Sequence, residues 1–194
     1  EPRITGVNLE VDLYPDDIRF DIKGSYQLIN KNSCVLDTLQ VSIIPWVELD
    51  ELSFSVPVEI VDSASEHGFY VYKLSNSIAP GDSITMHFDY TLADKGFHHW
   101  GHSTDIVSNG SFINMKYMPA FGYNDAGELR DKKERKKAGL PEKNYESPEI
   151  SDSSYYANTY ISANADRIRY EAVISTNKDQ IAISCGKLVD EWVE

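Results

Sequence analysis

The sequence predicts a mostly β fold, an antiparallel β-sandwich or a saddle-like curved sheet with one long insertion that carries a short helix. Three observations lead to this prediction. Short runs alternate between apolar and polar side chains, turn-forming residues separate the runs, and almost no segment repeats its apolar residues at helical spacing. Because a chain of 194 residues can bury a substantial core, we expect one β domain over residues 1–194, with a central insertion over residues 96–160.

Two alternating runs open the chain. Residues 7–13 place apolar side chains at every second position, and residues 18–28 do the same after a Pro-Asp turn that begins at Pro15. Side chains of a strand point to opposite faces in turn, so each run has one apolar and one polar face. The two runs therefore predict an antiparallel hairpin with one face buried and the other in water.

Further strands follow along the chain. Leu39, Val41 and Ile43 alternate in a third strand, and the Ile78-Ala-Pro-Gly-Asp82 turn precedes another. A last pair is expected near the C-terminal end, where Ile181 and Ile183 continue the pattern after a turn at residues 176–179. The other predicted strands cover residues 52–56, 58–61, 69–74, 84–90 and 168–174.

The central insertion contains a charged segment, Glu128–Ala138, that predicts a helix ended by Gly139. Its single apolar anchor, Leu129, indicates an exposed helix. Residues 142–160, rich in Ser, Pro and Tyr, are expected to form a surface loop.

The charge is uneven. The chain carries a formal net charge of −13, which disfavours nucleic acid as a partner. Residues 128–143 nevertheless hold seven Lys or Arg against four acids, a local charge of +3 that leaves −16 on the rest. A solvated helix face explains this island, and an acidic partner or anionic head groups are the alternative. The chain starts at Glu1 without a Met, and residues 188–194 resemble a strand cut short, so we expect a piece of a longer protein. Because no apolar run is long enough to span a bilayer, we expect this piece to be soluble.

Few residues are candidates for chemistry. His99 and His102 are weak metal-ligand candidates, but the glycines around them disfavour a helix that would align them, so a loop with incidental histidines is the preferred interpretation. No catalytic motif occurs, and His-Glu-x-x-His is absent. Cys34 and Cys185 are too few for a disulfide scaffold, and whether they pair stays open. We therefore predict no catalytic residue and no metal site in this chain.

Several blocks together resemble a known family. They are Asn109-Gly-Ser-Phe-Ile-Asn114, Met118-Pro-Ala-Phe-Gly-Tyr123 and Gly139-Leu-Pro-Glu-Lys143, together with the opening hairpin and the Ile183-Ser-Cys-Gly-Lys-Leu188 pattern. The chain resembles the N-terminal domain of the aminopeptidase N family of zinc metallopeptidases, and most closely a bacterial branch fused to an ABC transporter permease.

The resemblance implies a β domain beside a separate thermolysin-like catalytic domain, whose His-Glu-x-x-His holds the zinc. It implies that the present residues bind no cofactor and help to wall the peptide cleft, with Asn114, Met118, Phe121 and Tyr123 as the cleft candidates. Asn114 is the stand-in for the family's contact to the substrate amine. Core packing explains Phe121, Tyr123 and Met118 equally well.

Two functions remain at this stage. The first is a non-catalytic N-terminal domain of an aminopeptidase-like zinc metallopeptidase, whose partners are the following catalytic domain, a peptide substrate and, through a fused permease, a membrane. The longer protein would then be membrane-anchored, with this domain extracytoplasmic. The alternative is an extracytoplasmic peptide- or protein-binding β module of a transporter-associated protein without hydrolytic activity.

Overall fold

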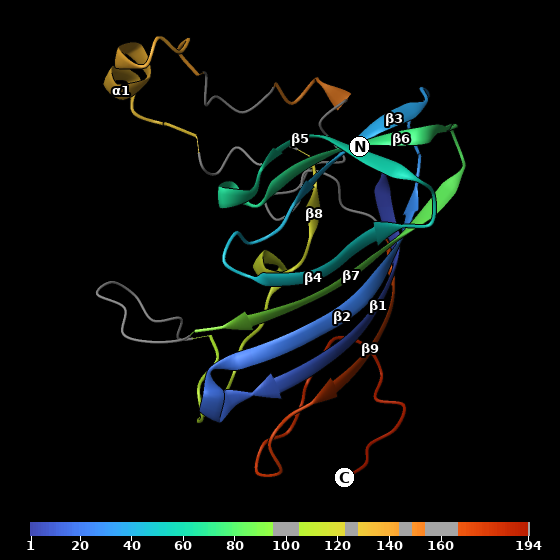
Figure 1. The fold of residues 1–194 in the computed structure, drawn as a ribbon, viewed down its shortest axis with the longest axis vertical. Helices are drawn as coiled ribbons and strands as arrows, with labels where there is room; N and C mark the ends of the chain where they lie inside the picture. Colours follow the sequence, from blue (N-terminus) through green and yellow to red (C-terminus); the bar gives the residue numbers. More distant parts are fainter. Residues whose placement is uncertain (95–104, 123–127, 144–148, 154–166, 194) are drawn as a thin grey trace. The chain divides into compact units, whose positions relative to one another are not determined.

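The computed structural model describes residues 1–94, 105–122, 128–143, 149–153 and 167–193. The chain divides into two compact units, of which the first comprises Glu1–Gly122 with Arg167–Glu194 and the second comprises Tyr123–Asp166. The first unit contains all the strands of the described residues, and the second contains the α-helix (Figure 1). The mostly β fold class is confirmed, whereas the assignment of residues 1–194 to one domain stays a prediction.

The strands of the described residues form two sheets. Their bounds are β1 Arg3–Tyr14, β2 Arg19–Ile29, β3 Leu36–Ser42, β4 Glu48–Phe54, β5 Val58–Ala64, β6 Phe69–Ile78, β7 Ser83–Ala93, β8 Ala120–Phe121 and β9 Arg169–Ser175. The helical elements are the 3-10 turns η1 Pro15–Asp17, η2 Ser65–His67 and η3 Met115–Tyr117, and the helix α1 Lys132–Lys137.

The larger sheet has five strands in the order β4-β7-β2-β1-β9, and they lie side by side in Figure 1. The predicted opening hairpin is its centre, because β1 pairs with β2 antiparallel and Val11 lies opposite Ile22. β9 pairs with β1 in parallel, with Val11 opposite Ile174. The sheet is therefore antiparallel except at this edge.

The alternation of the sequence puts one face of this sheet into the core. In β2, Phe20 and Ile22 are buried, and in β7 the same holds for Met86, Phe88 and Tyr90. Burying one such side chain stabilises the fold by about 1.5–3 kcal/mol relative to its exposure to water. This apolar face explains why these residues form strands rather than helices.

The smaller sheet, in the order β5-β6-β3-β8, packs onto the same core. Tyr72 of β6 is 4% exposed and meets Phe54 of β4 edge-to-face, with ring centroids 5.2 Å apart. Leu39 and Val41 of β3 are buried in the same cluster. Two sheets that share one apolar cluster are the sandwich arrangement that the sequence predicted.

One predicted strand is wrong. Residues 176–193 contain no strand, and Ile181 and Ile183 are 82% and 88% exposed. The two isoleucines have the right spacing, but a strand also needs a neighbour that accepts and donates main-chain hydrogen bonds. No ladder to this segment is formed by the described residues.

The predicted helix is shorter than expected and is not simply exposed. The Asp131 side chain accepts hydrogen bonds from the main-chain amides of Lys133 and Glu134, at 2.9 and 3.0 Å, so the helix starts after this cap. Gly139 follows the helix with φ +70°, as predicted for its end. Arg135, in contrast, is buried. The sequence pattern had offered only Leu129 as an anchor, because it counts apolar residues alone.

Candidate functional site

The segment of residues 105–122, called here the cleft segment, contains the three cleft candidates that the structure describes. It is held on the core of the first unit by Ile106 and Tyr117, which are 0% and 4% exposed. The Tyr117 ring packs edge-to-face on Phe20 of β2, with ring centroids 5.3 Å apart and an interplanar angle of 83°. Aromatic pairs in this geometry add about 0.5–1.5 kcal/mol to the burial of their area. The cleft segment is therefore packed against the larger sheet through these two side chains.

A second contact joins the cleft segment to the sheet through a buried hydroxyl. Tyr90 of β7 donates this hydroxyl to the main-chain carbonyl of Tyr117, and the Met118 sulfur lies 4.0 Å from the same oxygen. Removal from water raises the pKa of Tyr90 far above its ordinary value. The tyrosine therefore stays a neutral donor at any ordinary pH.

Asp105 is the polar centre of the cleft segment. Tyr117 donates its hydroxyl to Asp105 Oδ2 at 2.6 Å, and the Lys116 ammonium forms an ion pair with the same oxygen. The hydrogen bonds from Lys116 and then from Tyr117 hold the pKa of Asp105 below its ordinary value. The bond to Asp105 likewise raises the pKa of Lys116. Both groups stay charged at neutral pH. Their ion pair therefore connects Asp105, at the start of the cleft segment, to Lys116 in its middle.

The structure places three of the four predicted cleft residues along this segment. Asn114 is exposed and caps η3, because its Oδ1 accepts a hydrogen bond of 2.9 Å from the main-chain amide of Lys116. Met118 and Phe121 are half-buried and pack against the core, and Phe121 pairs with Val41 in the short strand β8. Of these three side chains, only Asn114 faces water freely.

The remaining candidates cannot be placed in this arrangement. Tyr123, which was predicted with the cleft residues, lies outside the described residues. The same is true of His99 and His102, the weak metal-ligand candidates. Within the described ranges, no group of three or more His, Cys, Asp or Glu side chains could hold a metal ion. Cys34 and Cys185 are both exposed free thiols.

Two exposed apolar side chains flank Asn114. Phe112 is 68% exposed and Met115 is 78% exposed. Neither residue was among the cleft candidates that the sequence predicted. The sequence also missed the Asp105 network, because a lone aspartate after a loop gives no signal of its partners. An exposed amide between two exposed apolar groups is a surface that could contact a peptide.

A run of exposed apolar residues follows β9. The residues are Ile181, Ile183, Leu188, Val189, Trp192 and Val193, and their exposed fractions range from 59% to 93%. We call residues 181–193 the apolar segment. It begins beside the cleft segment, because Gln180 donates its side-chain amide to the main-chain carbonyl of Ser108 at 2.9 Å. The Tyr170 and Ser184 hydroxyls, 2.8 Å apart, join its start to β9.

No helix in the described part of the chain has the length and apolar character needed to cross a membrane.

No family model matches the chain, and no curated protein matches it. Similar solved structures include a two-domain M1 zinc metallopeptidase mutant bound to L-tryptophan, at 9% sequence identity and a TM-score of 0.39 over 48% of this chain. Another is the M1 zinc metallopeptidase from Deinococcus radiodurans, at 10% identity and a TM-score of 0.38 over 48% of this chain. The chain covers 21% of the length of each. Similarity at these scores establishes neither the family nor an activity of this chain.

Proposed function

We propose that the chain is a non-catalytic N-terminal β domain of an aminopeptidase-like zinc metallopeptidase, and that it helps to wall the peptide cleft. The zinc and its His-Glu-x-x-His ligands belong to a catalytic domain elsewhere in the longer protein. That protein is anchored in a membrane through a fused permease, and the present domain is extracytoplasmic. These statements extend the sequence resemblance carried by residues 109–114, 118–123 and 139–143.

The exposure of the apolar segment is the observation that carries the proposal. Six large apolar side chains within 13 residues lie open to water. Large apolar side chains that lie exposed close together in the sequence are candidates for contact with another protein surface or a membrane. Covering one such side chain stabilises a complex by up to about 1.5–3 kcal/mol. A catalytic domain that covers residues 181–193 would also lie next to the cleft segment, because Gln180 is bonded to Ser108.

The cleft segment supports the proposed role through its chemistry. Asn114 offers an exposed amide, which can accept a hydrogen bond from a peptide amine or donate one to a carbonyl. Phe112 and Met115 beside it offer adaptable apolar contacts. The anchors of this segment, Tyr117 and Tyr90, keep the surface in place on the sheet. Such a wall can position a peptide.

The division of labour is tested by comparing the 194-residue chain with a longer protein that carries it. Both are supplied with zinc and with aminoacyl amide substrates. We expect turnover by the longer protein and none by the 194-residue chain. Turnover by the short chain would refute the proposal, and so would a longer protein that binds peptides without hydrolysing them.

The role of Asn114 is tested in the longer protein with the substitution Asn114→Ser. Serine caps a helical turn about as well as asparagine, so η3 is preserved while the amide is lost. We expect the KM for aminoacyl substrates to rise by about tenfold, the value of one hydrogen bond of about 1.4 kcal/mol. The control is Lys178→Ser, a substitution at an exposed turn. Equal KM values in the two variants would show that Asn114 does not contact the substrate.

A further inference from the structure

The second unit has a basic hollow beside its helix. The hollow has a volume of about 390 Å³ and is lined by Lys132, Lys133, Lys136, Leu140 and Glu142. Three of its lining residues are cations and one is an anion, so the lining has a net charge of +2. This positive surface occurs in a chain whose net charge is −13. The hollow, called here the lysine hollow, is not used by the function proposed above.

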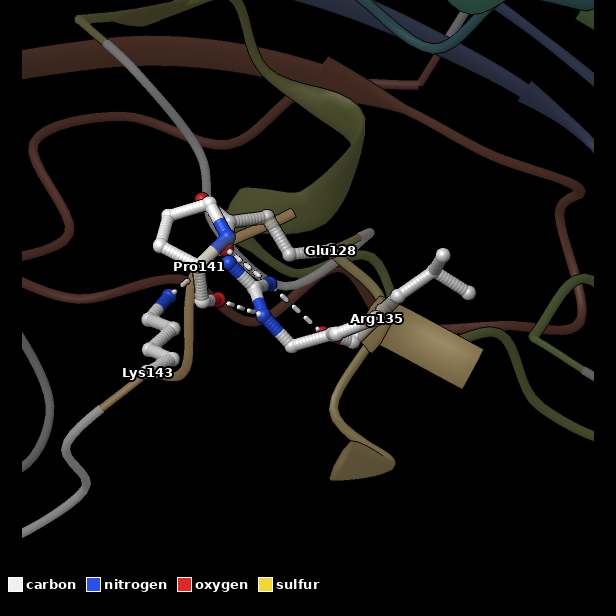
Figure 2. A network of polar contacts seen from close by, with 5 residues as sticks. Glu128, Arg135, Pro141 and Lys143 are labelled. Carbon is white, nitrogen blue, oxygen red and sulfur yellow. Dashed lines mark hydrogen bonds and ion pairs between the residues drawn. The ribbon is translucent and has the colours of Figure 1, made fainter. Parts of the chain in front are cut away.

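A buried guanidinium, that of Arg135, joins the chain on the two sides of α1 through a network of polar contacts (Figure 2). Arg135 points away from solvent, and its Nε donates to the Pro141 carbonyl at 2.9 Å. Its Nη1 donates to the Leu129 carbonyl at 2.8 Å and to Glu128 Oε2 at 3.1 Å. Lys143 reaches the same Glu128 oxygen at 3.1 Å. These bonds join the chain before the helix to the chain after it, and Pro141 lies between the lining residues Leu140 and Glu142.

The lysines that line the hollow keep most of their charge uncompensated. Among the described residues, the one ion-pair partner of Lys132 is Glu142, at a long 3.9 Å. Lys133 and Lys136 form no ion pair with any residue that the structure describes. Lys137, outside the hollow, is paired with Glu134 at 2.6 Å. The free positive charge of α1 is therefore concentrated at the hollow.

The kind of cation indicates the kind of partner. Arginine recognises a single phosphate or carboxylate with two parallel hydrogen bonds, whereas lysine is a flexible, hydrated point charge. Arg135 is engaged inside the unit, and the cations in the lining of the hollow are all lysines. Leu140 in the lining is 45% exposed. Several lysine cations beside an exposed leucine suit a fluid array of anionic head groups better than one rigid anion.

We propose that the lysine hollow is a docking surface for the anionic lipid head groups of a membrane. Each lysine near an anionic bilayer raises the partition onto it by about fivefold, so three contribute about a hundredfold. The inference stands without the proposed function, because it uses only the contacts of the second unit.

The test is partition of the 194-residue chain onto vesicles, measured by sedimentation at physiological salt. We expect binding to vesicles that contain phosphatidylglycerol and none to vesicles of phosphatidylcholine alone. The variant Lys132→Gln, Lys133→Gln, Lys136→Gln should bind about a hundredfold more weakly. The matched control, Lys23→Gln, Lys73→Gln, Lys178→Gln, removes the same charge from exposed positions of the first unit and should bind as the unchanged chain does.

Three results would overturn the proposal. They are absence of binding to the anionic vesicles, an equal loss of binding in both triple variants, and binding of soluble polyglutamate as strong as that of the vesicles. The last result would mean that the hollow takes an acidic protein segment instead of a membrane. Circular dichroism of each variant verifies that the β fold is retained, so a loss of binding reports on the lysines.

Discussion

The Tyr90 hydroxyl of β7 donates a hydrogen bond to the main-chain carbonyl of Tyr117 in the cleft segment. Tyr90 is 0% exposed and Tyr117 is 4% exposed, so both groups have left water. A buried carbonyl without a donor costs about 1–3 kcal/mol. This bond therefore holds the cleft segment on β7 and contributes to the stability of the first unit.

The substitution Tyr90→Phe should destabilise the chain by about 1–3 kcal/mol, because it leaves the Tyr117 carbonyl buried without its donor. Urea unfolding followed by circular dichroism measures this loss. Tyr70→Phe is the control, since Tyr70 lies half-buried on β6, and it should change the free energy of unfolding by less than about 0.5 kcal/mol. Equal losses in the two variants would show that the hydrogen bond has no special role.

The lowered pKa of Asp105 should make the free energy of unfolding depend on pH in the acid range. Its pKa is lowered in the folded chain by the hydrogen bonds from Lys116 and Tyr117, so the folded state favours the carboxylate. The stability that this group contributes is fully present above its ordinary pKa of 3.8 and is lost as the pH falls below that value through the folded pKa.

The variant Asp105→Asn should therefore be less stable than the unchanged chain at neutral pH, and the difference should shrink as the pH falls below 3.8. Urea unfolding at a series of pH values measures it. Asp62→Asn removes the same charge from an exposed position on β5 and serves as the control. A stability difference for Asp105→Asn that stayed constant down to pH 2 would contradict the account.

Gly68 connects η2 to β6 at a place without room for a side chain. Its φ is +66°, and an added Cβ would lie 1.7 Å from the main-chain oxygen of Ile43. Gly68→Ala should therefore lower the free energy of unfolding by about 3 kcal/mol or more. The alanine would be strained at this positive φ, and the main chain at Ile43 would have to move to make room for the Cβ. Gly81→Ala, also at positive φ but with open space around it, should cost only about 1–2 kcal/mol. Thermal unfolding of both variants compares them, and equal midpoints would exclude the clash.

Arg135 should control the local stability of the second unit. Arg135→Lys loses the bonds to Pro141 and Leu129 and should cost about 2 kcal/mol, which speeds amide hydrogen exchange in α1 by about 30-fold. Lys137→Gln breaks only an exposed ion pair and should change exchange by less than about threefold. Exchange that is unchanged in Arg135→Lys would mean that the guanidinium does not hold the helix.

The sequence predicted the strands whose alternation matches burial. Ile22 and Phe88 lie at apolar positions of period two and are buried, because a sheet with one wet face needs that pattern. The same pattern does not say which strand lies next to which. Val11 and Ile174 are far apart in sequence and their parallel pairing was not predicted. Ile181 and Ile183 show the period too, yet no ladder forms there.

The sequence named candidate residues for the site, but it did not reveal the contacts that hold the segment in which three of them lie. Asn114 was singled out from a motif, and the structure adds that its side chain caps η3. The partners of Asp105 come from residues 11 and 12 positions later, a spacing that belongs to no regular element. Arg135 was counted as part of an exposed basic helix, because charge alone does not reveal that carbonyls and a carboxylate enclose the guanidinium.

Hydrogen exchange over residues 180–193 tests the central claim most directly, namely that the apolar segment is covered by a catalytic domain. The measurement compares the 194-residue chain with the longer protein under the same conditions. If the segment is an interface, its amides should exchange at least about tenfold more slowly in the longer protein, because exchange then requires the interface to open. Equal exchange rates in the two proteins would show that nothing covers the segment and would contradict the account.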